Sequence, residues 1–165
     1  MKSIRNIAFS ALLAIGAFSM VTYTACNKDE CKDVVCNNGG TCVTGTCNCL
    51  SGYEGTKCDV VSAASLPGQY TASETCQPPV TGGSWSSAVT QSSTDKTRIV
   101  IANFGDSGSN VTGHVNKNAI TLDATTIGSN TVTGTGTVSG NILTINYTLT
   151  NGVASFSCTM TMTKQ

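Results

Sequence analysis

Near the C-terminus, apolar and polar residues alternate with the two-residue period of a half-buried β-strand. In the first run, Leu143, Ile145, Tyr147 and Leu149 alternate with Thr and Asn. In the second run, the apolar positions are Ala154, Phe156, Cys158, Met160 and Met162. One face of each run is therefore predicted to be core and the other to be solvated. Asn151-Gly152, between the two runs, predicts a two-residue hairpin turn.

Shorter runs rich in Thr, Val and Ile lie upstream and are separated by clusters of Gly, Asn, Asp, Ser or Pro. They predict strands near residues 69–76, 85–92, 98–103, 111–115, 119–124 and 131–139. With the two runs above, about eight short strands follow one another, and helix-length apolar periodicity is absent. The predicted fold class is therefore all-β, with an antiparallel up-and-down β-barrel as the main expectation and a β-sandwich as the alternative.

Two cysteines favour closure into a barrel. Cys76 shares a face of the first predicted strand with Tyr70 and Ala72, and Cys158 lies on the apolar face of the last. A Cys76–Cys158 disulfide would join these strands from the inside and contribute about 4–5 kcal/mol in the chain-entropy model. Gly134 and Gly136 share the inward face of their strand, which predicts a bend or a bulge, with close approach of a ligand as the alternative.

The first 25 residues have the layout of an export signal. Lys2 and Arg5 form a positive start, residues 7–21 are almost entirely apolar, and Ala25 is a small residue directly before Cys26. About 15 apolar residues are fewer than the roughly 20 that a membrane-spanning helix needs. Residues 1–25 are therefore predicted to direct export to a compartment in which disulfides form.

Residues 31–58 contain six cysteines and two glycine-bearing turns. The cysteines are separated by 4, 5, 4, 1 and 8 residues, and the turns are Asn38-Gly39-Gly40 and Gly52-Tyr53-Glu54-Gly55. Spacing alone does not fix the pairing. The pattern closely resembles the epidermal-growth-factor-like (EGF-like) module, and this resemblance implies disulfides Cys31–Cys42, Cys36–Cys47 and Cys49–Cys58. A module of about 28 residues needs such cross-links because its apolar core is too small.

The charge of the chain is balanced and sparse. The 165 residues include 9 basic and 9 acidic side chains and a single histidine, His114. A nucleic-acid partner is not expected, because such a protein would show a basic stripe. His114 has no partner in the sequence pattern and the carboxylates show no paired arrangement, so the protein is predicted not to be an enzyme.

Nine cysteines are an odd number, and Cys26 accounts for the odd one. A cysteine directly after the small residue that ends an export signal resembles the bacterial lipoprotein signal, although Tyr23 stands where that signal prefers Leu. The resemblance implies that Cys26 is acylated and becomes the N-terminus. Lys28, Asp29 and Glu30 resemble the signal that sends lipoproteins of Bacteroidetes-type bacteria to the cell surface. Residues 26–30 are thus expected to be an acylated linker at the outer membrane.

Two other interpretations of this linker remain. It can be a solvated charged segment, or the opening of a calcium-binding EGF-like module, in which Asn27, Asp29 and Glu30 would supply oxygen ligands. That version also places an Asn or Asp, followed by an aromatic residue, between the third and fourth cysteines, and residues 43–46 contain neither. No metal or other cofactor is therefore predicted, with calcium as the alternative.

Residues 66–164 resemble the lipocalin-like or calycin-like β domains of Bacteroidetes lipoproteins, through Pro67-Gly68-Gln69-Tyr70 and the run at residues 99–104. The expected order is a linker at 59–68 and a lipocalin-like barrel at 69–165. The predicted function is a lipid-anchored surface protein that presents a non-catalytic binding, adhesion or structural module. The alternative is a carrier of a small apolar ligand. The expected partners are the membrane and a protein, glycan or small apolar ligand.

Overall fold

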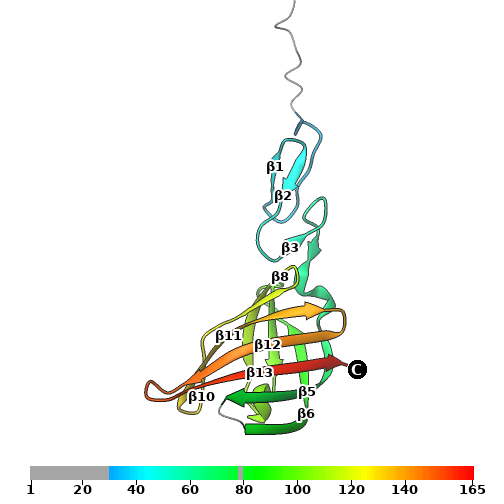
Figure 1. Cartoon of the computed structure of the whole chain (residues 1–165). Helices are drawn as coiled ribbons and strands as arrows, with labels where there is room; N and C mark the ends of the chain where they lie inside the picture. Colours follow the sequence, from blue (N-terminus) through cyan, green and yellow to red (C-terminus); the bar gives the residue numbers. More distant parts are fainter. Residues whose placement is uncertain (1–29, 78–79) are drawn as a thin grey trace, which may run out of the picture.

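The computed structural model describes residues 30–77 and 80–165, which form a disulfide-rich stalk and a β-barrel (Figure 1). The stalk extends from one end of the barrel, and its first described residues lie at the end away from the barrel. The predicted export signal at 1–25, Cys26 and residues 27–29 lie outside the described residues. The all-β prediction is confirmed, since the remaining elements are two short 3-10 helices, η1 and η2.

The stalk contains two small hairpins. Strands β1 (Thr41–Val43) and β2 (Thr46–Asn48) are joined by Thr44 and Gly45, whose φ angles of 46° and 77° are those of a tight type I′ turn. Strands β3 (Tyr53–Glu54) and β4 (Val60–Val61) form the second hairpin, next to the barrel. The stalk is held by three disulfides, which follow the EGF-like pairing: Cys31–Cys42, Cys36–Cys47 and Cys49–Cys58.

The barrel is an up-and-down meander in which every strand is antiparallel to its neighbours. Its strands are β5 (Gly68–Gln77), β6 (Val80–Gln91), β7 (Arg98–Ala102), β8 (Val111–Asn116), β9 (Ala119–Leu122), β10 (Thr125–Ile127), β11 (Asn130–Ser139), β12 (Ile142–Thr150) and β13 (Ser155–Lys164). The sheet closes because β13 pairs with β5 and β11 pairs with β9. The barrel prediction is therefore confirmed and the sandwich alternative is wrong.

The strand predicted at residues 119–124 ends at Leu122, and a further short strand that was not predicted, β10, follows at Thr125–Ile127. Both β9 and β10 pair with β11, but Thr121 faces Thr135 whereas Thr125 faces Val132, so the register shifts by one residue between them. Asp123 and Ala124 form the resulting bulge. Together, β9 and β10 occupy the position of one of the eight strands of the barrel.

Inward side chains fill the barrel. Their alternation in β12 follows the prediction, with Leu143, Ile145 and Tyr147 buried. The largest fully buried side chains are Tyr70, Phe104, Ile99, Ile101, Ile120, Leu143, Ile145, Met160 and Met162. Phe104 belongs to η2 (Phe104–Asp106), which covers the end of the barrel farther from the stalk. The interior is thus a packed core over most of its length.

The hairpin between β12 and β13 differs from the prediction. It has a four-residue loop, 151–154, in which the Asn151 side-chain oxygen accepts hydrogen bonds from the amides of Val153 (3.0 Å) and Ala154 (2.8 Å). The hairpin extends past the barrel wall, as Figure 1 shows at its lower left. Ala154 and Phe156, which were predicted to face the core, are therefore exposed, because no facing strand covers them.

The segment predicted to be a linker, 59–68, has secondary structure and packs against the barrel. It contains β4 and η1 (Ser62–Ser65), and it places Ala63 and Leu66 in the core at the stalk end of the barrel. The Tyr70 hydroxyl donates a hydrogen bond to the Leu66 carbonyl (2.7 Å). Segment 59–68 therefore closes one end of the barrel as well as joining the stalk to it.

Candidate functional site

Two places in the described structure bring polar side chains together around the barrel ends. One is the mouth that lies away from the stalk, and the other is the joint between the stalk and the barrel. Each is built from segments that are far apart in the sequence.

A hollow of about 210 Å³ lies at the mouth, and Phe104, Gly105, Ile127 and Leu149 provide much of its lining. The Tyr147 hydroxyl donates a short hydrogen bond to the Glu74 carboxylate at this place. Both side chains project from the inward faces of their strands, β12 and β5. The hollow therefore combines apolar walls with one buried phenol and one half-buried carboxylate.

The environment of Tyr147 favours its neutral form. Burial raises the pKa of the Tyr147 phenol, and the hydrogen bond to Glu74 and the negative charge of that carboxylate raise this pKa further. The Phe104 ring lies edge-on to the Tyr147 ring at 4.8 Å between centroids. The phenol is thus a fixed, neutral donor over a wide pH range.

Gly134 and Gly136 lie beside this region but admit no ligand. They face Tyr147 and Ile145 across a regular β11–β12 register, and their missing side chains let β12 come close. A Cβ at Gly134 would lie 2.7 Å from the Tyr147 Cα. The register shows no bulge at these glycines, and β12 occupies the space that a ligand would need to approach them.

At the joint, the single histidine has partners that no sequence pattern indicated. His114, on β8, lies 2.9 Å through Nε2 from the Ser51 hydroxyl of the stalk and 3.2 Å through Nδ1 from the Thr97 hydroxyl. Thr97 donates to the Asp95 carboxylate at 2.6 Å. An ionised carboxylate only accepts, so Thr97 accepts from Nδ1–H, and in the neutral imidazole the Ser51 hydroxyl then donates to Nε2.

On the barrel side, the carboxylates near His114 and its hydrogen bonds are balanced by a positive charge. Hydrogen bonds from the Thr97 hydroxyl and amide hold the pKa of Asp95 below its usual value, with smaller contributions from Arg98 and His114. Arg98 forms ion pairs with both Asp95 and Asp123. The carboxylates near His114 are therefore already paired with a cation.

Two further contacts tie the stalk and the connecting segment 59–68 to the barrel. The Gly52 amide donates to the Asn116 side chain (3.4 Å), and the Lys117 amide donates to the Ser62 hydroxyl (2.9 Å). The order Ser, His, Thr, Asp is that of a nucleophile with a base, but the amide beside Ser51 is occupied by Asn116 and is not free to bind an oxyanion. We therefore assign this chain of hydrogen bonds to holding the two modules together.

The predicted site residues are only partly described. The four predicted disulfides are all present, and Cys76–Cys158 joins β5 to β13 at directly opposed positions. Cys26, Asn27, Lys28 and Asp29 lie outside the described residues, so their predicted roles stay predictions. Glu30 is described and exposed. Within residues 30–77 and 80–165, no group of three His, Cys, Asp or Glu side chains is arranged to hold a metal ion.

Sequence reasoning missed Glu74, Phe104, Ser51 and Thr97. The pattern around Glu74 contained one usable signal, since this carboxylate occupies an inward position between Ala72 and Cys76. Comparisons with protein-family models and with curated proteins find no match for this sequence. Among the described residues there is no helix with the length and apolar character needed to cross a membrane.

Proposed function

We propose that this protein is a lipid-anchored surface protein in which Cys26 carries the acyl chains, the stalk is a rigid spacer and the barrel is a non-catalytic binding head. The export signal and the residues after Cys26 support the outer membrane as its location. The acyl chains supply the membrane affinity, about 0.8 kcal/mol for each buried methylene.

The arrangement of the joint is the observation that carries this proposal. The stalk is cross-linked by three disulfides and is hydrogen-bonded to one end of the barrel through Ser51 and Gly52, with Ser62 of the connecting segment beside them. The hollow beside η2 lies at the end of the barrel opposite the stalk, and the stalk does not run along the strands that face the viewer in Figure 1. A tether at the stalk tip would therefore leave the mouth and the barrel wall accessible.

The anchor is tested in the native host with an alkyne-labelled fatty acid. Wild-type protein should incorporate the label, and the Cys26→Ser variant should not. A second variant, with Lys28, Asp29 and Glu30 all changed to Ala, should keep the label but lose cleavage by protease added to intact cells. Labelling of Cys26→Ser would contradict the anchor, and unchanged cleavage of the triple variant would contradict the export signal.

The mouth supports a second candidate function, carriage of one small ligand. Its hollow of about 210 Å³ is smaller than the roughly 300–1,000 Å³ of drug-sized sites, so only a small molecule would fit. Apolar walls with a phenol and a carboxylate suit a compact apolar molecule with one hydrogen-bonding group. The packed core beneath the mouth makes this the second candidate and presentation the first.

Native mass spectrometry of protein extracted gently from its own membrane tests the carrier function. A retained small molecule in the wild type should be lost in Ile127→Trp, which fills the hollow. Ile142→Trp is the control, because Ile142 is exposed on the outside of β12 at the other end. A wild-type protein that retains nothing would remove the carrier function.

A further inference from the structure

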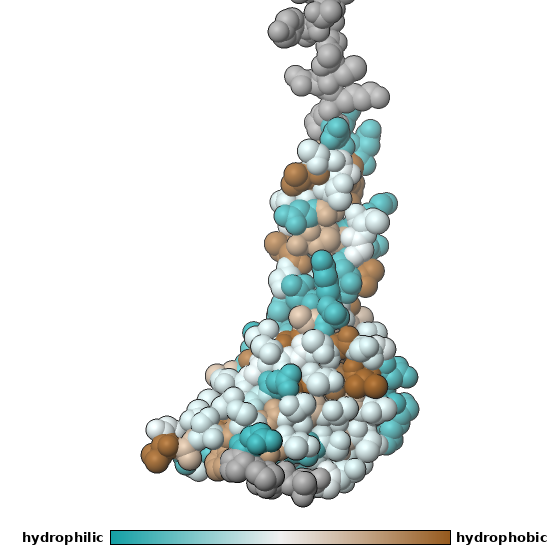
Figure 2. All heavy atoms as spheres, in the orientation of Figure 1, coloured by the Kyte–Doolittle hydropathy of each residue, from teal (hydrophilic) through white to brown (hydrophobic). Residues whose placement is uncertain are grey.

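The outward positions of β11, β12, β13 and β5 form a continuous surface without charge, which we name the hydroxyl face. One row across it consists of Thr135, Asn146, Thr159 and Thr75, each opposite the next in the pairing register. The neighbouring row consists of Thr137, Thr144, Thr161 and Ser73. Figure 2 shows this side of the barrel as a broad pale surface, the colour of Ser and Thr.

The composition of the hydroxyl face is unusual for a protein surface. None of the outward positions of these four strands, all of which are described, carries an acidic or basic side chain. Neighbouring strands lie about 4.8 Å apart and alternate residues about 6.7 Å apart along a strand, so the rows form a lattice of hydrogen-bonding groups. Each hydroxyl can donate and accept, and each amide offers both functions.

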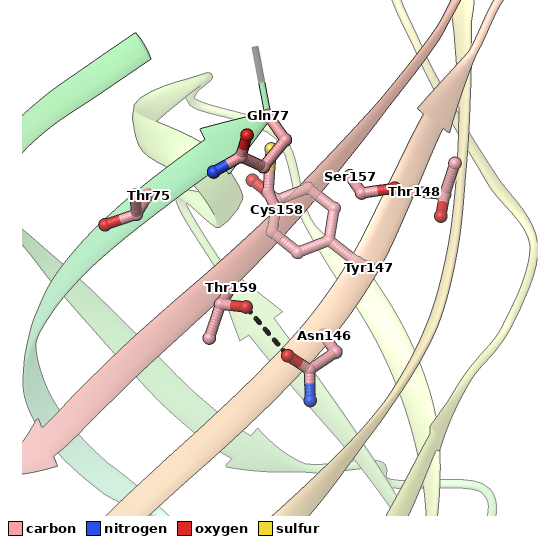
Figure 3. A pocket seen from close by; sticks show the side chains of 8 residues that line it. All are labelled: Thr75, Gln77, Asn146, Tyr147, Thr148, Ser157, Cys158 and Thr159. Carbon is pink, nitrogen blue, oxygen red and sulfur yellow. Dashed lines mark hydrogen bonds between the residues drawn. The ribbon is translucent and has the colours of Figure 1, made fainter. Parts of the chain in front are cut away.

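A hollow of about 340 Å³ lies within the hydroxyl face, where β12, β13 and β5 run side by side. Six outward side chains line it, Thr75, Gln77, Asn146, Thr148, Ser157 and Thr159, and Tyr147 and Cys158 from the inward positions complete the lining (Figure 3). The six outward side chains, all in the described part of the chain, make one hydrogen bond, from the Thr159 hydroxyl to the Asn146 side-chain oxygen (2.8 Å). The other polar groups are available to a ligand.

We propose that the hydroxyl face binds a neutral, hydroxyl-rich polymer, that is, an uncharged polysaccharide. An anionic ligand would find no cation there, and an apolar partner would find only Ile142 at the margin of the face. A single exposed hydrogen bond adds little affinity, because each group gives up a hydrogen bond to water, so useful affinity needs several sugar units along one row. The site lies on the outside of the wall and does not depend on the anchor, and Tyr147 lines both its hollow and the mouth.

Affinity electrophoresis of the full chain in gels containing dextran, mannan, laminarin or soluble starch tests this proposal. At least one of these polymers should retard the wild type. Thr75, Thr148 and Thr159 are then changed together to Val, which keeps the shape and the strand preference but removes three hydroxyls. This variant should bind at least ten-fold more weakly. The control carries Thr46→Val and Thr90→Val, both at exposed positions away from the face, and should bind as the wild type does.

Amide NMR spectra of the wild type supply a second measurement that does not depend on any variant. Addition of the retarding polymer should shift amides of β5, β12 and β13, while those of the stalk stay unchanged. Four outcomes would overturn the proposal. They are no retardation by any of the four polymers, shifts confined to other strands, unchanged affinity of the triple variant, and concentration-dependent dimerisation through this face without polymer binding.

Discussion

Gly134 sets how closely two strands of the barrel approach, and its replacement has a predictable cost. A Cβ at this position would overlap the carbonyl oxygen of Asn146 and lie 2.7 Å from the Tyr147 Cα, where backbone atoms cannot yield easily. Gly134→Ala should therefore reduce the free energy of unfolding by about 1–3 kcal/mol, as overpacking does elsewhere. Urea denaturation monitored by circular dichroism measures this change.

Gly83→Ala is the matched control for that experiment. Gly83 lies in β6, which pairs with β5 and β7, and a Cβ there would meet no atom within 4 Å. The free energy of unfolding of the Gly83→Ala variant should equal or slightly exceed that of the wild type, because alanine restricts the unfolded chain more than glycine does. Equal destabilisation by both substitutions would mean that close approach of β12 is not the cause.

The Tyr147–Glu74 pair predicts how stability depends on alkaline pH. The pKa of Tyr147 is raised in the folded state, so the folded protein keeps this proton while the unfolded chain loses it above about pH 10. The stabilisation is thus complete below about pH 10 and is lost as the pH rises further. The free energy of unfolding, measured in urea from pH 8 to 11, should fall at the upper end.

Tyr147→Phe should flatten this alkaline decline and also reduce stability at neutral pH by roughly 1–2 kcal/mol, because Glu74 loses its hydrogen-bond donor. A residual decline is expected from Tyr70, whose pKa burial also raises. Tyr53→Phe in the stalk controls for the loss of a phenol elsewhere. A decline that is as steep in Tyr147→Phe as in the wild type would contradict the assignment.

Among the elements, β5 and β13 form the seam on which the barrel closes. They pair from Lys164 opposite Tyr70 to Ser157 opposite Gln77, and Cys76–Cys158 joins them across 82 residues of sequence. Changing both cysteines to Ala should lower the free energy of unfolding by about 4–5 kcal/mol in the chain-entropy model, with the β-structure retained by the paired strands. Urea denaturation under oxidising conditions measures the loss.

A variant with Cys31→Ala and Cys42→Ala is the control for the seam. This disulfide spans only 11 residues and lies in the stalk, so its removal should leave the unfolding midpoint of the barrel unchanged. The seam would have no special role if both double variants shifted the barrel midpoint equally. Tryptophan fluorescence follows the barrel selectively, because Trp85 lies on β6.

The elements were predictable wherever one face of a strand is covered. Alternation identified β12 and most of β13, because burial selects apolar side chains at every second position. It failed at Ala154 and Phe156, since the same alternation continues into a hairpin that projects beyond the barrel wall. The bulge at Asp123 was also missed, because a one-residue shift of register does not require any particular residue type in the sequence.

At the scale of the whole molecule, the joint could not be predicted. Ser51 and His114 are separated by 63 residues, and the hydrogen bond between them depends on how two modules with separate cores are stacked. The EGF-like pairing was predictable from a family pattern, but no such pattern describes this contact. The mouth was partly predictable, since Tyr147 was expected to face inward, whereas its partner Glu74 was not recognised.

The close contacts at the joint yield a prediction for the molecule as a unit. Gly52 has a φ of 88°, and a Cβ there would lie 2.5 Å from the Thr97 side chain of the barrel. Gly52→Ala should therefore push the stalk away from the barrel and break the Ser51–His114 hydrogen bond. In ¹⁵N relaxation experiments, the stalk and the barrel should tumble as one body in the wild type and with separate correlation times in Gly52→Ala.

Gly45→Ala separates this interpretation from simple backbone strain. Gly45 also has a left-handed φ, 77°, but it lies in the β1–β2 turn, where the nearest atoms are those of Glu30 at 3.6 Å. Both substitutions impose a similar local cost, whereas only Gly52→Ala introduces a clash with the barrel. Separate tumbling in Gly45→Ala as well, or in the wild type, would mean that the joint does not hold the two modules as a rigid unit. The stalk would then be a flexible tether, and the orientation of the barrel would not be fixed by the anchor.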